Sequence, residues 1–421
     1  MLLNKIAICI ALAIFTCLAG FTGCGTKDPL EPEQGVGVPP EVVSVFPADQ
    51  AIGIPVNTPI RVTFSENIDY TTLGPQTFAC DHEVTGTIIY SPNTATLTPS
   101  PFLEFGETYT VAVTTDIKDK DGESLVESVW WHFTTGHPWS AASAISIARS
   151  GLGVAAANGR VYAMGGFDGM SYRNEMEEYN PATNQWTLVA PMPTGRYSLA
   201  AATGGSLIYA AGGVPTGGMP TAMEEYNPAT NTWRARTSMP TPRIRLAAAA
   251  YQGIVWVIGG SGDSQDVGKL VERFDIQNNT WSTAASMPTT RAGLAVVLLN
   301  GKIYAIGGVQ SASTHLSTVE VFDPGANSWS SATPMLTPRS NLAAAVVAGK
   351  IYVFGGVNAT GTLSTVEEYD PATNSWKTKT PMPAPRQEMS AAALDGKIYV
   401  IGGYYQQMKA DVYVYNPALD P

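Results

Sequence analysis

Cysteine is scarce in this chain of 421 residues. Three of its four cysteines, Cys9, Cys17 and Cys24, lie near the N-terminus, which leaves Cys80 alone in the rest of the sequence. A lone thiol can form neither a disulfide framework nor a zinc site built from cysteines. We therefore expect packing to hold the fold, with no metal site and no cofactor.

Positive charge is also limited. The 24 lysines and arginines are outnumbered by 35 aspartates and glutamates, which gives a net charge of −11. Such a surface repels the phosphates of nucleic acids and anionic lipid headgroups, so we expect no nucleic-acid partner. Charged residues make up only 14% of the chain, whereas its 41 glycines and 30 prolines favour short strands joined by many turns.

The first residues have the pattern of an export signal. Lys5 precedes a long apolar run, and no acidic residue occurs before Asp28. The run ends in "FTGC", which resembles the lipobox of bacterial lipoproteins, although Phe21 replaces the usual aliphatic residue. The resemblance implies a signal peptide over 1–23, a lipidated Cys24 and a polar tether over 24–37. A plain secretory signal cleaved nearby is the alternative.

The segment 38–136 consists of short runs of β-forming residues separated by turns. Strict alternation in "IRVTF" and "TYTVAV" places one face in a core and the other in water, as in an antiparallel sandwich. The segment resembles the bacterial Ig-like domains of S-layer and other cell-surface proteins. The motifs that carry this resemblance are "FPAD", "VTFSENID", "YTVAV", "DKDG" and "WHFTTG".

From residue 137 onward the sequence repeats with a period of 47 or 48 residues. Each of six copies contains an arginine, a glycine pair sixteen residues later and a downstream aromatic residue, which lies in a decapeptide such as "EEYNPATNQW"; the first five copies end in a tryptophan. The pattern predicts four strands per copy and therefore a β-propeller. It resembles the kelch repeat family. The glycine pairs begin at 165, 212, 259, 307, 355 and 402.

The frame of the repeats also predicts how the ring closes. Trp139 precedes the first glycine pair, and the last copy ends at Pro421 without its own tryptophan. We expect the strand around Trp139 to complete the last blade, which protects sheet edges that would otherwise pair with another chain. The predicted fold is thus all-β: an N-terminal Ig-like sandwich followed by a six-bladed kelch propeller over 137–421, acting as a monomer.

Residues shared by all copies are expected to build the scaffold. Six arginines recur ten residues after each tryptophan, and a glutamate precedes the decapeptide aromatic in five copies. We predict that these groups pair, because an unpaired ring of half-buried charge is costly; an open anion site is the alternative. The glutamates are Glu177, Glu224, Glu272, Glu320 and Glu367.

Function is expected where the copies differ. Two residues past each arginine, period-2 alternation is expected to aim side chains in the same direction as the arginine, and three of these positions carry Arg245, Asn341 and Glu388. We predict that they form a polar cluster at the channel mouth with residues of the loops after the glycine pairs. The loop residues are Asp168, Tyr172, Arg173, Asp263, Asp266, Tyr404 and Tyr405.

Several enzyme classes can be weighed on these residues. A copper site like that of kelch-type galactose oxidases needs two histidines and a Tyr–Cys crosslink, but the propeller has no cysteine and, apart from His137 at its border, only His315. A serine hydrolase would depend on His315 alone, without a nucleophile elbow. The chain is also similar to exported kelch mutarotases that epimerise sialic acid, which implies Glu388 as acid/base and Arg245 as carboxylate ligand.

The expected function is therefore binding rather than catalysis. We expect an exported bacterial protein at the outer membrane or cell surface, or else a periplasmic or secreted one, anchored to the membrane through Cys24. Its partner would be a protein or glycan of the envelope or extracellular space. A cofactor-free sugar mutarotase and a purely structural surface protein remain the alternatives.

Overall fold

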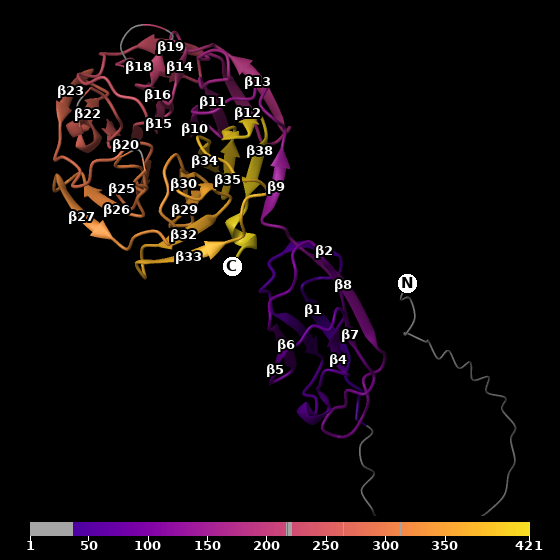
Figure 1. Ribbon diagram of the computed structural model, residues 1–421. Helices are drawn as coiled ribbons and strands as arrows, with labels where there is room; N and C mark the ends of the chain where they lie inside the picture. Colours follow the sequence, from indigo (N-terminus) through magenta and orange to yellow (C-terminus); the bar gives the residue numbers. More distant parts are fainter. Residues whose placement is uncertain (1–36, 216, 218–220, 264, 312) are drawn as a thin grey trace, which may run out of the picture.

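The computed structural model describes residues 37–215, 217, 221–263, 265–311 and 313–421, which form an all-β chain of two domains (Figure 1). The predicted signal peptide, Cys24 and nearly all of the tether lie outside the described residues. Within the described part of the chain, no helix is long and apolar enough to span a membrane.

The N-terminal domain is a sandwich of two four-stranded sheets. Alternate residues of its strands point into one core, in which Val62, Val111 and Trp131 are buried. One sheet has the order β1 (Val42–Phe46), β3 (Ile60–Phe64), β6 (Thr94–Pro99), β5 (Gly86–Ser91). The other has the order β2 (Ala51–Ile54), β8 (Val129–Thr135), β7 (Thr108–Val113), β4 (Phe78–Cys80), and a 3₁₀ helix, η1 (Tyr70–Thr72), joins the two sheets.

The sandwich departs from the predicted antiparallel pattern at one edge. Strand β2 runs parallel to β8, with Ala51 opposite Phe133 and a register shift before Ile54. The expectation of purely antiparallel pairing was therefore wrong for this strand. The segment "AIGI" is too short and too rich in glycine to stand out by alternation, and its pairing with β8 is non-local.

The C-terminal domain contains six four-stranded sheets arranged as the blades of a ring (Figure 1). The first three consist of β10 (Gly153–Ala157), β11 (Arg160–Met164), β12 (Met176–Asn180), β13 (Gln185–Val189); β15 (Ala200–Gly204), β16 (Leu207–Ala211), β18 (Met223–Asn227), β19 (Thr232–Ala235); and β20 (Ala247–Tyr251), β21 (Ile254–Ile258), β22 (Val271–Asp275), β23 (Thr280–Thr283).

The next three are β24 (Ala295–Leu299), β25 (Lys302–Ile306), β26 (Val319–Asp323), β27 (Ser328–Ala332); β28 (Ala343–Val347), β29 (Lys350–Phe354), β32 (Val366–Asp370), β33 (Ser375–Lys379); and β34 (Ser390–Leu394), β35 (Lys397–Ile401), β38 (Val412–Tyr415), β9 (Trp139–Ala142). Minor elements are β14 (Arg196–Tyr197), β17 (Val214–Pro215), β30 (Val357–Asn358), β31 (Gly361–Thr362), β36 (Tyr404–Tyr405), β37 (Gln407–Met408), η2 (Gln265–Lys269) and η3 (Pro417–Leu419).

Tryptophans link each blade to the one before it. Strand β9 pairs with β38, with Trp139 opposite Tyr415, so the last blade contains strands from both ends of the domain. The indole Nε1 of Trp139 donates to the carbonyl oxygen of Thr380 in the preceding blade, at 3.0 Å. The other five tryptophans make the same bond at 2.7–2.8 Å, so each indole satisfies its donor while its ring packs between blades.

The predicted arginine–glutamate pairs are present. In the fourth blade Arg291 is fully buried, and its Nη2 donates to Glu320 Oε2 at 2.7 Å, while Nη1 donates to the carbonyl oxygens of Gly307 and Thr318. Four other blades repeat the pair, and in the sixth Arg386 pairs instead with Asp411. The arginines therefore hold the scaffold together and do not form an open anion site.

The glycine pairs bring neighbouring blades close to these arginines. The amide of Gly308 donates to the carbonyl oxygen of Arg339 in the next blade at 2.9 Å. A Cβ on Gly307 would lie 2.7 Å from the same oxygen, and φ is positive at both glycines. Glycine is required here because any larger residue would separate the blades. This contact fixes the start of each inner strand, where the candidate site lies.

Candidate functional site

One residue from each blade forms a ring at the mouth of the central channel. Each lies two positions past the buried arginine, and each has a φ between 53° and 59°. The ring consists, in chain order, of Gly151, Ser198, Arg245, Gly293, Asn341 and Glu388.

Backbone hydrogen bonds join these six residues into a closed circle. The amide of each residue donates to the carbonyl oxygen of its counterpart in the preceding blade, at 2.7–3.1 Å, and the amide of Gly151 closes the circle on Glu388. The left-handed conformation is what turns each amide toward the neighbouring blade. The mouth is therefore a rigid frame on which the six side chains are displayed.

The expectation that these side chains point in the same direction as the buried arginines was wrong. Period-2 alternation does not operate here, since the residues have positive φ and the regular inner strands begin two residues later, as β10 does at Gly153. The buried Arg149 points into its own blade and bonds to Glu177, whereas Gly151 lines the channel. A turn in the left-handed region separates the two directions.

The two glycines of the ring leave room for neighbouring side chains. A Cβ on Gly151 would lie 2.3 Å from the ring of Tyr197, and a Cβ on Gly293 would lie 2.4 Å from Oδ1 of Asn341. Tyr197 and Asn341 therefore extend over the adjacent blade. The six-fold backbone frame thus carries an asymmetric set of side chains.

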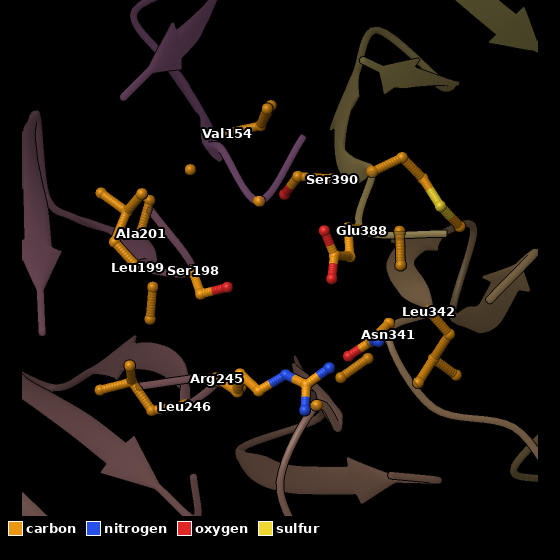
Figure 2. Close-up of a pocket in the computed structure, with 18 of the residues that line it drawn as sticks. Val154, Ser198, Leu199, Ala201, Arg245, Leu246, Asn341, Leu342, Glu388 and Ser390 are labelled. Atoms are coloured by element: carbon orange, nitrogen blue, oxygen red, sulfur yellow. The ribbon is translucent and has the colours of Figure 1, made fainter. Parts of the chain in front are cut away.

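Glu388 is held from one side only. Its Oε2 accepts hydrogen bonds from the hydroxyl of Tyr197 at 2.7 Å and from Oγ of Ser150 at 3.0 Å. Burial, reinforced by the charge of Glu388, raises the pKa of Tyr197 to about 12, so Tyr197 is a permanent donor at neutral pH. Within the described part of the chain, no donor forms a hydrogen bond with Oε1, and the carboxylate extends into the opening (Figure 2).

Arg245 lies across the mouth from Glu388. In the order of the ring, two other blades lie between them in either direction, and Figure 2 shows both side chains extending into the opening from opposite sides. The described residues provide no hydrogen-bond acceptor or ion-pair partner for the guanidinium of Arg245. Its charge is therefore available to a ligand.

The space between these side chains has a volume of about 170 Å³ and continues toward walls of alanine, leucine and valine. A second space, of about 310 Å³, occupies the other end of the channel. The two spaces share one ring of lining residues on the inner strands of the six blades. The only polar side chain lining the second space is Thr203, whose hydroxyl already donates to the carbonyl oxygen of Ala156. Charged groups are thus concentrated at one end of the channel.

The loop candidates of the first blade stabilise their own loop. Asp168 pairs with Arg173 at 2.7 Å and accepts from the amides of Ser171 and Met170, and these backbone bonds, with that of Ser171 first, lower its pKa. Tyr172 stacks on Tyr197 with ring centroids 6.1 Å apart and planes 8° from parallel. These residues support the side of the mouth rather than line the 170 Å³ space.

Asp263, Tyr404 and Tyr405 do not line this space either. Asp263 is exposed, Asp266 lies in η2, and Tyr404 and Tyr405 form β36, with Tyr404 37% exposed. Of the candidates named from sequence, those that line the space are Arg245, Asn341 and Glu388.

Two contributors were not identified from the sequence. Tyr197 and Ser150 follow the buried arginines directly, where the other copies carry Ile244, Ala292, Ser340 and Gln387. Comparing this position across copies would have singled out Tyr197, since no other copy has an aromatic residue there.

Neither a serine nucleophile nor a metal centre is assembled in the described residues. His315 Nδ1 lies 3.0 Å from Oγ of Ser340, but that serine is only 2% exposed and cannot reach a substrate. No cluster of three or more histidine, cysteine, aspartate or glutamate side chains is arranged to hold a metal ion among the residues described. The available chemistry at the mouth consists of hydrogen bonding, charge and proton exchange.

Comparisons with known proteins agree with this architecture. Residues 36–135 match the model of the bacterial Ig-like domain, residues 148–193 match the kelch motif, and residues 255–419 match the Attractin/LZTR1 beta-propeller. No curated protein matches the chain.

Many solved structures share the fold. One of them, titled "Structure of YjhT", has a TM-score of 0.57 and 18% identity, and the match covers 65% of this chain and 95% of that one. Identity at this level shows a common fold and nothing more. The chain is therefore a bacterial Ig-like domain followed by a kelch β-propeller.

Proposed function

We propose that the propeller is a binding module whose channel mouth takes a polar ligand, a glycan or an exposed part of a protein. The observation that carries this proposal is the conformation of Arg245 and Glu388. Both have φ above 50°, where a side chain is unfavourable and glycine is not. Strained, charged residues facing an opening are typical of functional positions, because packing alone would favour glycine there.

The connection between the domains suits presentation of the mouth. The chain leaves β8 at Thr135 and enters the propeller at Trp139, which pairs with Tyr415, the last residue of β38. The other end of β38 begins next to Asp411, whose carbonyl oxygen accepts a hydrogen bond from the amide of Gly402, in the glycine pair beside the mouth. The Ig-like domain is therefore joined at the face opposite the mouth, so the mouth is directed away from it.

The Ig-like domain acts in this proposal as a spacer at the cell envelope. The basis is the sequence of the N-terminal segment, which resembles a lipoprotein signal ending at Cys24. The intact mass of the protein from the membrane fraction tests this part. We expect a diacylglyceryl-modified N-terminal cysteine, and an unmodified N-terminus would contradict it.

The binding function is tested with an array of envelope glycans and extracellular proteins. We expect at least one ligand whose binding is weakened about tenfold or more by Arg245→Gln, as expected when a charge-assisted hydrogen bond is lost. Arg234→Gln is the matched control, because Arg234 is exposed on β19. Binding that is equally sensitive to both variants would argue against the mouth, and an array without any ligand would favour a structural surface protein.

A second candidate function is sugar mutarotation without a cofactor. The free Oε1 of Glu388 supports it, since a carboxylate fixed through its other oxygen is able to exchange a proton with a sugar hydroxyl. Exchange NMR on reducing sugars tests it. Catalysed anomer exchange that disappears in Glu388→Gln would establish catalysis, whereas binding without exchange would leave the mouth as a binding site only.

A further inference from the structure

The mouth presents one positive and one negative group on opposite sides of a small space. Arg245 and Glu388 are the charged members of the six-residue ring, and two other blades lie between them in each direction. No ion pair joins them in the described part of the chain. Two opposite charges that face each other without pairing leave room for a ligand between them.

Each group retains unused binding capacity. The guanidinium of Arg245 has no acceptor among the described residues, and Glu388 uses Oε2 for Tyr197 and Ser150 while Oε1 stays free. These contacts fix Glu388 on its own side of the mouth. An open donor group and an open acceptor group thus define the two ends of one site.

We propose that the mouth binds a small zwitterion, a ligand with a carboxylate at one end and an ammonium group at the other. This inference rests on the proposed function of the mouth and names its ligand class. The ligand carboxylate pairs with Arg245 and the ammonium group donates to Oε1 of Glu388. Asn341, whose side chain lies over Gly293, supplies a neutral hydrogen bond between them.

The charge arrangement disfavours other ligands. A ligand with only negative charge meets Glu388 across the space, and one with only positive charge meets Arg245, so each encounters one repulsive group. The volume of about 170 Å³ suits an end group the size of an amino acid. Free amino acids and the ends of short peptides share this chemistry.

Titration calorimetry and NMR with three matched probes test the proposal on the full chain. The probes are 4-aminobutyrate, butyrate and butylammonium, which have the same carbon chain and differ in charge. We expect 4-aminobutyrate to bind at least about tenfold more tightly than either of the others, the effect of adding one partly screened ion pair. Its affinity should fall as the salt concentration rises.

Variants separate the two ends of the site. In Arg245→Gln the advantage of 4-aminobutyrate over butylammonium should disappear, and in Glu388→Gln its advantage over butyrate should disappear. Arg245→Lys should keep part of the preference, because it keeps the charge. Glycine, 6-aminohexanoate and triglycine then measure the charge separation that fits best and distinguish a free amino acid from a peptide end.

Two results would overturn the inference. One is equal binding of the three probes, or a preference for butyrate or butylammonium. The other is no binding of any probe, together with a stability coupling between Arg245→Gln and Glu388→Gln, which would make the two residues partners of each other. If glycans bind in an Arg245-dependent manner while the probes do not, the proposed function stands and the zwitterion is wrong.

Discussion

The hydroxyl of Tyr197 donates a hydrogen bond of 2.7 Å to Oε2 of Glu388, although 191 residues separate the two in sequence. The bond reaches from the second blade, over Gly151 of the first, to the sixth. It fixes the carboxylate that faces the mouth. Closure of the ring therefore bears directly on the geometry of the candidate site, because the sixth blade is completed by β9 from the other end of the domain.

Replacing Gly151 with alanine should disturb this bond. The new Cβ would lie 2.3 Å from the Tyr197 ring, so the ring must move away from Glu388. We expect a loss of about 1–3 kcal/mol in the free energy of unfolding, measured by denaturant titration, and weaker ligand binding at the mouth.

Gly159→Ala is the matched control for this change. Gly159 also has a positive φ, 71°, but a Cβ there would meet no atom within 4 Å. It should show the backbone strain alone, about 1 kcal/mol, and leave the mouth intact. Equal effects of the two alanines would mean that the contact with Tyr197 does not matter.

Tyr197 should lose its proton only at high pH, and its protonated form should contribute to stability below that pH. Burial, followed by the charge of Glu388, raises its pKa from about 10 to about 12, so folding favours the protonated hydroxyl. This contribution is complete below pH 10 and is lost as the pH rises toward 12. NMR of ¹³C-labelled tyrosine, assigned with Tyr197→Phe, measures it, and Glu388→Gln should lower the observed pKa; a pKa near 10 in the wild type would contradict the described contact.

The repeats made the propeller predictable from the sequence, whereas the mouth was predictable only in part. The motif residues recur because each blade repeats the same local contacts, such as that of Arg291 with Glu320. The reach of Tyr197 to Glu388 depends on three blades at once and occurs only once. The parallel pairing of β2 with β8 was not predicted for a related reason, because the tertiary structure sets it.

Arg291→Ala should destabilise the propeller strongly. It removes the partner of Glu320, whose side chain is 5% exposed, and leaves a buried carboxylate without its cation. We expect a loss of about 3–5 kcal/mol and a clearly lower melting temperature. Unchanged stability together with lost ligand binding would favour an open anion site.

The sixth blade offers an internal comparison for that prediction. Arg386 pairs with Asp411, whose side chain is 56% exposed, so water can solvate the carboxylate once the arginine is removed. Arg386→Ala should therefore cost less than Arg291→Ala by calorimetry. A larger cost would show that its stacking on Tyr413, at 3.9 Å from the ring centroid, outweighs the ion pair.

Asp420 should stabilise the ring as an acceptor rather than through its charge. Its Oδ2 accepts from the amide of Thr380 and from the hydroxyl of Tyr415, just as Asn374 accepts from Thr333 and Tyr369 in the fifth blade. Asp420→Ala should lose about 1–3 kcal/mol, because the buried hydroxyl of Tyr415 and the partly buried amide of Thr380 lose their acceptor. Asp420→Asn keeps an acceptor oxygen and should stay close to the wild type; a loss as large as that of alanine would make the charge essential.

Arg245→Gly should separate stability from function. The residue has a φ of 54° and its side chain forms no hydrogen bond within the described fold, so glycine relieves backbone strain without the loss of a hydrogen bond. We expect the free energy of unfolding to stay constant or rise by up to about 1 kcal/mol, while binding at the mouth is lost. Ala348→Gly, with a φ of 50° at the turn between β28 and β29, should give a similar gain and leave binding unchanged. A destabilised Arg245→Gly variant beside a stabilised Ala348→Gly variant would mean that Arg245 is retained for the fold rather than for a ligand.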